Sequence, residues 1–297
     1  MARSSGREGA YGSEVLERSN RKPGRLGIAL VRASAMLTVA VLVFIIGYVM
    51  ARGAKMMTPG FLFGSPEKMG REGGIFPSIV GTVVLTLSSV LIAAPLGIGT
   101  AVFLTEYTRE GLFSRIVRFG TESLAGIPSI IFGLFGFLFF VIRLGMGWSI
   151  LSGSLTLAAM MLPTIVRTSE EALRSVPDVY KETAYALGAS RWQTVTSVVL
   201  PTATPGIATG VVLAMGRAVG ETAAVIFTAG SSLRLPKSIF DPVRTLPVHF
   251  YILAREGISI ENAYGTAAVL LTAVLLVDFA AYYILHRVSK RRPATGR

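Results

Sequence analysis

Arg217 and Glu221 are the residues whose types and spacing most clearly indicate chemistry. They lie four residues apart within a long apolar stretch. An arginine at the centre of a membrane-spanning helix costs about 2.5–3.5 kcal/mol on insertion scales, so it normally faces a bundle interior or a water-filled path. Its planar guanidinium matches the oxygens of an oxyanion bidentately. The spacing predicts a pair on one helix face, which acts either as an anion relay or as a structural pair that neutralises itself.

Arg167 and Glu170 form a second predicted pair, at the end of another apolar stretch. Two interpretations are open. In one, Arg167 extends its side chain to the membrane interface and the two residues form an ordinary ion pair along the helix. In the other, they form part of a functional site. Asp278 stands alone in the last apolar stretch. It is expected to pair with a basic group of another helix or subunit, or to extend toward the interface.

Composition indicates what kind of molecule positions these residues. The chain has 297 residues, 52% of them hydrophobic and 15% charged, with a mean hydropathy of +0.60. Soluble proteins average about 25% charged residues, and the apolar stretches reach the ~18 residues that cross a bilayer. No ten-residue alternation typical of a membrane β-barrel is present. The sequence therefore predicts an all-α, polytopic membrane protein.

Charge and metal-binding residues narrow the class further. The net charge of +12 would suggest nucleic-acid binding in a soluble protein, but here the charges lie mainly at the ends of apolar stretches. The absence of cysteine excludes disulfides and thiolate metal sites. The two histidines, His249 and His286, are too far apart in the sequence to suggest a metal cluster, and no metal site is predicted.

Six transmembrane helices are predicted. They cover Ile28–Met50, Pro77–Phe103, Ser123–Ile142, Ile150–Val166, Thr204–Ala229 and Thr266–Leu285. Glycines recur within them at three- and four-residue spacing, which permits close helix packing in lipid.

The basic tails predict the orientation. Residues 1–27 and 286–297 are both rich in arginine and lysine, so the positive-inside rule places the N- and C-termini in the cytoplasm. The first transmembrane helix, 28–50, is followed by an outer segment at 51–76. The core at 77–285 then contains a cytoplasmic loop at 167–201.

That cytoplasmic loop has the pattern of a helical elbow. Apolar residues recur at helical spacing up to Leu187, and Gly188 is a typical helix stop. Ser190 and Gln193 form a capping-box pattern that opens a second helix, which Pro201 is expected to end. A stiff elbow of this kind suits a part that transmits movement between a soluble protein and a membrane bundle.

The loop resembles the EAA loop of ABC importer permeases. Glu182, Ala184, Gly188, Leu200 and Pro201 stand at the motif positions, with Thr183 for the usual alanine and Val198 for the usual isoleucine. The resemblance implies a type I, MetI-like permease bundle whose loop docks on a separate ATPase. Trp192 is read as a docking residue within the same loop.

Three further segments resemble phosphate permeases of the PstA and PstC type, with PstA the more similar. These are residues 124–136, 167–177 and 216–224. The resemblance implies that Arg217 and Glu221 act in phosphate translocation, and that Arg167 and Glu170 act near the exit or in coupling. It also implies a bacterial plasma (inner) membrane location.

The resemblance further implies separate partner chains. The sequence contains no Gly-x4-Gly-Lys-Ser/Thr loop for ATP phosphates. The chain is therefore expected to be non-catalytic and to hold no cofactor, with ATP and Mg on a PstB-like ATPase dimer. A PstC-like second permease would complete the pathway, and a PstS-like extracytoplasmic protein would deliver phosphate.

Three alternatives remain open from the residues. An arginine also binds other oxyanions, so an ABC permease for phosphonate, sulfate or molybdate is possible. A secondary transporter or channel would work without ATP but would leave the elbow unused. A membrane-embedded enzyme ranks last, because no nucleophile–base or metal-ligand set lies in the predicted spans.

Overall fold

The computed structural model describes residues 25–290 and divides the chain at Val49 and Met50 into two units. The predicted tails at 1–27 and 286–297 therefore lie mostly outside the described residues. In the first unit the described part belongs to α2 (Arg25–Gly53), an apolar helix long enough to cross a membrane. No proline interrupts it, and nearly all its described side chains are exposed, which is what lipid contact requires of a spanning helix.

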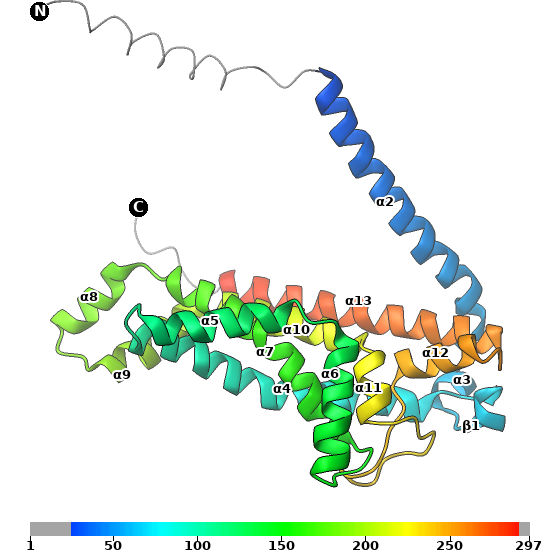
Figure 1. The fold of residues 1–297 in the computed structure, drawn as a ribbon. Helices are drawn as coiled ribbons and strands as arrows, with labels where there is room; N and C mark the ends of the chain where they lie inside the picture. Colours follow the sequence, from blue (N-terminus) through cyan, green and yellow to red (C-terminus); the bar gives the residue numbers. More distant parts are fainter. Residues whose placement is uncertain (1–24, 291–297) are drawn as a thin grey trace, which may run out of the picture. The chain divides into compact units, whose positions relative to one another are not determined.

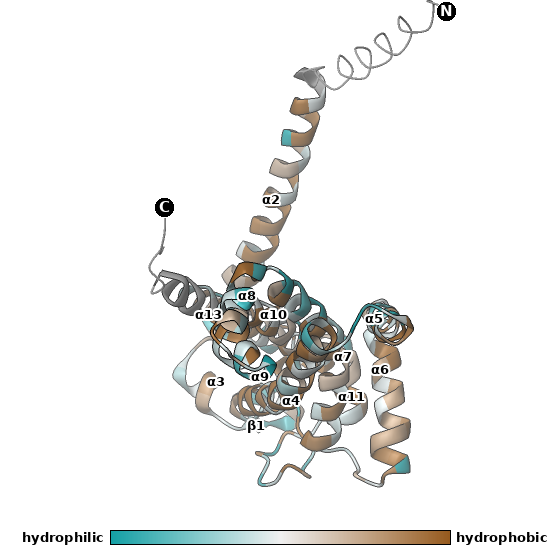
Figure 2. Ribbon diagram, turned by 90° about the vertical axis from the view of Figure 1, so that its left-hand side faces the viewer, coloured by the Kyte–Doolittle hydropathy of each residue, from teal (hydrophilic) through white to brown (hydrophobic). Residues whose placement is uncertain are grey.

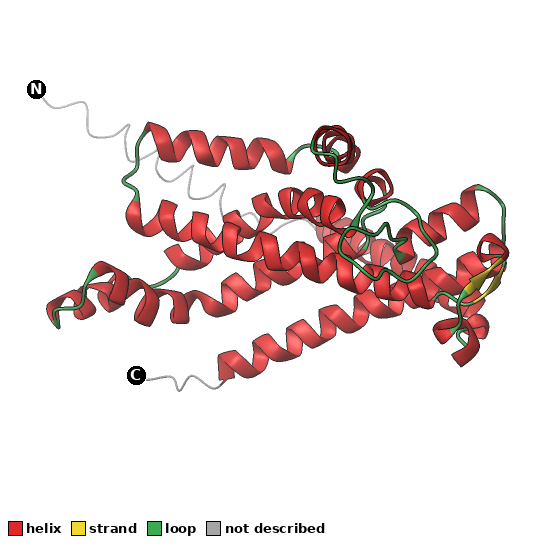
Figure 3. Cartoon of the chain, turned by 90° about the horizontal axis from the view of Figure 1, so that it is seen from below, coloured by secondary structure: helices red, strands yellow, loops and turns green. Residues whose placement is uncertain are grey.

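The second unit is a helical bundle that begins with a small substructure at one end. It comprises η1 (Ala54–Met56), α3 (Pro59–Phe63), β1 (Pro66–Glu67), η2 (Lys68–Gly70) and β2 (Glu72–Gly73). The two strands pair antiparallel, and they lie at the end of the bundle that we call the hairpin end (Figure 3). The helix α12 (Leu246–Arg255) lies at the same end (Figure 1).

Three long helices form the centre of the bundle. They are α4 (Phe76–Val102), α7 (Ile150–Arg174) and α10 (Leu200–Val219), and α13 (Ile260–Lys290) packs on α10 and α12. Leu85, Leu157, Ile165 and Ala214 are buried where they meet. The opposite end carries α8 (Asp178–Ala186) and α9 (Arg191–Thr194) (Figure 1), and we call it the elbow end.

Small residues set the close packing of these helices, as predicted. A Cβ at Gly97 of α4 would lie 2.7 Å from Ile165 Cγ2 on α7. On α10, Gly206 faces Ala172 and Gly210 faces Thr168. These contacts bring the helix backbones together and fix an antiparallel register between α7 and α10.

The third predicted span, Ser123–Ile142, is wrong as a single helix. The structure has α5 (Leu112–Ala125), α6 (Ser129–Gly136) and the π turn η4 (Phe137–Arg143), with a bend of 102° between α5 and α6. Pro128 lacks a backbone N–H and disfavours the helical conformation of Ile127 before it, which favours a break here, although α4 and α7 continue through Pro95 and Pro163. In Figure 1 α5 runs along the bundle and α6 runs across it. Figure 2 shows that α6 is mostly hydrophobic.

The fifth predicted span, Thr204–Ala229, is also divided. Helix α10 ends at Val219, and α11 (Ala223–Thr228) follows after a break at Gly220–Thr222. In the described residues, five helices are long and apolar enough to cross a membrane. The bent α5–α6 pair makes a sixth if the two helices together form one span. These counts apply to residues 25–290, and within that range the fold is mostly helical.

Candidate functional site

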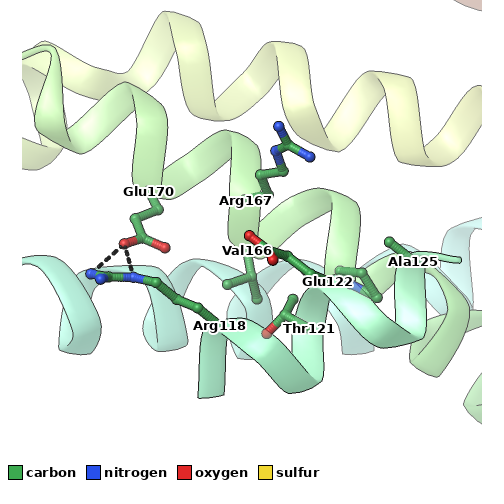
Figure 4. A pocket seen from close by; sticks show the side chains of 8 residues that line it. Arg118, Thr121, Glu122, Ala125, Val166, Arg167 and Glu170 are labelled. Atoms are coloured by element: carbon green, nitrogen blue, oxygen red, sulfur yellow. Dashed lines mark hydrogen bonds and ion pairs between the residues drawn. The ribbon is translucent and has the colours of Figure 1, made fainter. Parts of the chain in front are cut away.

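A network of charged side chains joins α5 to α7 near the elbow end. Glu170 is its centre and is nearly buried, with 11% of its side chain exposed. Its Oε1 accepts from Arg118 Nη2 at 2.8 Å and from Arg174 Nη2 at 2.9 Å. Glu110 lies 3.5 Å from Arg118 and 3.7 Å from Arg174. One buried carboxylate therefore holds two guanidinium groups from two different helices, and Figure 4 shows its contact with Arg118.

The predicted pairing of Arg167 with Glu170 is wrong. Arg167 pairs with Glu171 at 3.3 Å instead, and both side chains are exposed. Glu170 lies on the side of α7 that faces α5, where Arg118 reaches it across 52 residues of sequence. Arg118 lies outside the predicted spans, between Phe103 and Ser123, so the sequence does not indicate its contact with Glu170. The signal that indicates a helix there is the spacing of the apolar residues Leu112, Ile116 and Phe119, which recur every three or four residues.

A cavity of about 120 Å³ lies beside this network, between α5 and α7. Arg118 and Glu122 line it from α5, and Arg167 and Glu170 line it from α7, as Figure 4 shows. Pro163 and Val166 form its apolar wall. The cavity presents both signs of charge, and the carboxylate of Glu170 already holds the Arg118 guanidinium.

Arg217 lies in the last turn of α10, level with the middle of α7. The contacts of Gly206 with Ala172 and of Gly210 with Thr168 set the antiparallel register. Extending that register places Arg217 beside the layer of Met161, midway along the 25 residues of α7. The Arg217 side chain is exposed, and among residues 25–290 it forms no ion pair or hydrogen bond.

Glu221 does not share a helix face with Arg217, so that prediction is wrong. Helix α10 ends before Glu221, and the Glu221 carboxylate accepts the backbone N–H of Ala224 at 3.0 Å. This contact satisfies a donor at the start of α11 that would otherwise have no partner. Gly220 is the C-cap of α10, with a φ of −87° that any residue can adopt. The guanidinium at mid-depth is therefore left free for another partner.

Asp278 of α13 comes close to the same region. A Cβ at Gly216, the residue before Arg217, would lie 3.5 Å from Asp278 Oδ1. None of the ion pairs found in the described part of the chain includes Asp278. An exposed arginine and an exposed aspartate thus lie on adjacent helices.

The elbow has the predicted architecture of two helices around Gly188. Helix α8 ends before Gly188, whose φ of +84° favours glycine. Ser190 Oγ accepts the N–H of Gln193, and the Gln193 side chain accepts the N–H of Ser190, so the capping box is present. Pro201 does not end the second helix, which continues through the π turn η5 (Val195–Val199) into α10.

Exposed apolar side chains cover the outer surface of the elbow. Leu187 is 84% exposed and Trp192 is 66% exposed, whereas Ala184 and Val195 are buried against the bundle. Glu182 is also exposed. Single exposed apolar residues are common on proteins, but a group of them on a polar projection is typical of a protein-binding surface.

A buried polar pair lies toward the hairpin end. Arg244 is 6% exposed and donates from Nε to the Ser231 carbonyl at 2.9 Å, while its Nη1 lies 3.4 Å from His249 Nδ1. Burial lowers the pKa of His249 to about 4, and the positive charge of Arg244 adds to the effect. Burial also lowers the pKa of Arg244. No group of His, Asp and Glu side chains within residues 25–290 has the arrangement of a metal site.

The sequence is similar to a large family of membrane proteins. Residues 93–292 match the family described as binding-protein-dependent transport system inner membrane component. The phosphate transport system permease protein PstA of Mycobacterium leprae is 38% identical over 253 residues, 82% of this chain and 81% of that protein. YqgI of Bacillus subtilis, described as a probable ABC transporter permease protein, is 35% identical over 292 residues, 93% of this chain and 99% of that protein.

Solved structures show the same fold at low sequence identity. A bacterial alginate ABC transporter chain, in complex with an alginate-bound periplasmic protein, aligns with a TM-score of 0.63 and 17% identity, over 88% of this chain and 96% of that chain. A chain of the MetNI methionine ABC transporter aligns with a TM-score of 0.61 and 21% identity, over 72% and 95%. With the broken spans and the elbow in place, this chain belongs to the family of binding-protein-dependent transport system inner membrane components, the membrane subunits of ABC transporters.

Proposed function

We propose that this chain is a permease subunit of an ATP-driven importer of inorganic phosphate and forms half of its translocation pathway. The relatives from Mycobacterium, Xylella and Yersinia that are named phosphate transport system permease proteins support phosphate as the cargo. In the proposed orientation the elbow end faces the cytoplasm of a bacterium and the hairpin end faces outward. The membrane is the inner membrane, as the family description supports.

Arg217 carries the proposal. It is exposed, unpaired within the described residues and level with the middle of a spanning helix. A guanidinium at that depth is not stable against lipid, so it requires water or a second protein chain. We therefore place the pathway at the face of α10 that carries Arg217, where a PstC-like second permease covers it. The five donors of the guanidinium suit the oxygens of a dihydrogen or monohydrogen phosphate.

The remaining steps follow from the two ends of the bundle. A PstS-like protein delivers phosphate at the hairpin end, and the ion reaches Arg217 when the bundle opens outward. A PstB-like ATPase dimer binds the elbow, and its closure on ATP and Mg moves α8 and α9. The exposed Arg167 lines the cavity near the elbow end and attracts the ion toward the cytoplasm.

The test is phosphate uptake by the complete transporter reconstituted in vesicles. Arg217→Gln should lower ATP-dependent uptake about 10- to 100-fold, since hydrogen bonds to a charged group contribute about 1.5–3 kcal/mol. Arg217→Lys keeps the charge but loses the planar fork, so it should retain part of the uptake. Uptake at the normal rate by the glutamine variant would remove Arg217 from the pathway.

Two further arms separate the competing functions. Unlabelled sulfate, molybdate and a phosphonate are added in excess to labelled phosphate, and only unlabelled phosphate should compete. Strong competition by another anion would reassign the cargo. Uptake that persists in vesicles without the ATPase would indicate a secondary transporter or a channel.

A further inference from the structure

Two consecutive residues at the end of α4 contact both arms of the elbow. Glu106 and Tyr107 lie in the π turn η3 (Phe103–Tyr107), which continues α4 at the elbow end. Glu106 Oε1 lies 2.8 Å from Lys181 Nζ on α8. The Arg191 guanidinium on α9 lies over the Tyr107 ring, 5.2 Å from its centroid. Each arm of the elbow is thus held by its own residue.

The Glu106–Lys181 contact is a buried ion pair. Only 6% of the Glu106 side chain and 18% of the Lys181 side chain are exposed. Losing one partner of such a pair leaves an uncompensated charge in a poorly solvated place, which is strongly unfavourable. The end of α4 and helix α8 therefore stay together as long as both charges are present.

The second contact is weaker in kind but lies on the other arm. A cation over an aromatic face is attracted by the ring quadrupole within about 6 Å. The widened π turn changes the direction in which the last residues of α4 point, compared with a regular helix. As a result, Glu106 contacts the arm before Gly188 and Tyr107 contacts the arm after it.

Lys181 has one other carboxylate nearby, and it differs in burial. Asp178 Oδ1 lies 3.8 Å from Lys181 Nζ, but 86% of the Asp178 side chain is exposed. An exposed pair within one helix contributes little. The Asp178–Lys181 pair lies within α8 and connects no other element. The Glu106–Lys181 pair connects α8 to the end of α4, between residues that are 75 positions apart in the sequence.

We propose that Glu106 and Tyr107 are positioning residues that make the elbow and the end of α4 move as one body. Through them, a displacement of α8 and α9 is passed to α4, which packs against α7 over much of its length. The connection also continues past η3, because Glu110 contacts Arg118 and Arg174 of the α5–α7 network. The inference rests on one part of the proposed function, namely that an ATPase binds the elbow.

The first test measures phosphate transported per ATP hydrolysed in the reconstituted transporter. Glu106→Gln should lower this ratio by about fivefold or more, in the range usual for coupling between sites, while ATP hydrolysis continues. Asp178→Asn is the matched control, because it removes the exposed partner of the same lysine and should leave the ratio unchanged. A variant that merely misfolds would lower transport and hydrolysis together.

A second pair of variants tests the other arm without touching the buried charge. Tyr107→Leu should lower the ratio, and Tyr107→Phe should preserve it, since phenylalanine keeps the ring face for Arg191. Equal ratios in the leucine variant and the unmodified protein would overturn the role of Tyr107. An unchanged ratio in Glu106→Gln would overturn the proposal as a whole.

A third measurement does not depend on the cargo. Binding of the ATPase should slow backbone hydrogen exchange at residues 103–111 in the unmodified protein but not in Glu106→Gln. If the unmodified complex shows this protection yet imports no phosphate, the proposed cargo fails and the inference stands. If phosphate is imported but residues 103–111 are unaffected by the ATPase, the inference fails and the proposed function stands.

Discussion

The Glu221 carboxylate accepts the backbone N–H of Ala224 at 3.0 Å and forms no ion pair with Arg217, although the two residues are four apart in the sequence. The break after Val219 separates them. The break places the Glu221 carboxylate at the start of α11, where it forms no ion pair with the arginine, so the guanidinium stays available level with the middle of α7. The division of this span into two helices therefore determines the electrostatics of the region.

Removal of the Glu170 charge should destabilise the bundle near the elbow end. Glu170→Gln leaves Arg118 and Arg174 without their shared buried partner, at an expected cost of about 1–3 kcal/mol. Glu171→Gln is the control, because the Arg167–Glu171 pair is exposed and should contribute less than about 1 kcal/mol. Thermal unfolding in detergent measures both. Equal melting temperatures for the two variants would contradict the central role of Glu170.

Gly210 should tolerate no side chain. A Cβ there would overlap the Thr168 hydroxyl of α7, so Gly210→Ala should cost about 1–3 kcal/mol by overpacking. Gly99 of α4 has no atom near the position of a Cβ. Gly99→Ala should therefore leave stability unchanged or raise it by up to about 1 kcal/mol, through helix propensity. The melting temperatures of the two variants should move in opposite directions or differ clearly.

Trp192 should contribute to ATPase binding without contributing to the fold. Its side chain is 66% exposed on the elbow, so Trp192→Ala should leave the melting temperature unchanged. The affinity of the Trp192→Ala variant for the ATPase should fall about tenfold or more, which is the loss expected when a tryptophan at the centre of an interface is removed. Phe240 is 60% exposed in the segment between α11 and α12, and Phe240→Ala is the control. A normal affinity in the tryptophan variant would place the contact elsewhere on the elbow.

Acid should destabilise the structure around His249. The folded pKa of His249 is lowered to about 4 by burial, against 6.5 for the free side chain. Between these values the unfolded chain binds a proton that the folded chain excludes, so the stabilisation is complete above pH 6.5 and is lost as the pH falls toward 4. The loss amounts to about 3 kcal/mol at 1.36 kcal/mol per unit of pKa.

A variant isolates this effect from other groups that titrate in acid. His249→Gln removes the titration while keeping a polar side chain beside Arg244. The melting temperature of the unmodified protein should drop more steeply between pH 6.5 and 4.5 than that of the variant. Parallel curves would show that the pKa of His249 is the same in the folded and the unfolded chain.

The sequence predicts the elbow well because its signals are local. Gly188 ends one helix and the Ser190–Gln193 capping box begins the next. Both effects depend only on neighbouring residues in the sequence, so they do not require the rest of the bundle. The apolar spans are also local in origin, since they reflect preference for lipid. A run of apolar residues does not indicate where a helix breaks, however. The predicted third span therefore runs from the last residues of α5 into α6, and the predicted fifth span joins α10 to α11.

The ionic contacts were predicted poorly because they are set by packing. Arg118 reaches Glu170 only after α5 has packed on α7, and helical spacing along α7 carries no information about that neighbour. Arg217 lies in the last turn of α10, level with the middle of α7, but Glu221 is not its partner because α10 ends before Glu221. Gly206 and Gly210 pack closely against α7, as their spacing predicts. Gly220, in contrast, is the C-cap of α10.

The distance along the chain between Glu106 and Lys181 also bears on biosynthesis. The two residues are 75 positions apart, so at about 5–20 residues per second the carboxylate exists for roughly 4 to 15 s before its lysine has been synthesised. During that time the Glu106 carboxylate has no Lys181 to pair with, so the end of α4 cannot reach its final burial. A nascent chain interrupted before α8 would thus lack the contact that orients the elbow, and only chains translated past Lys181 would present a binding surface to the ATPase.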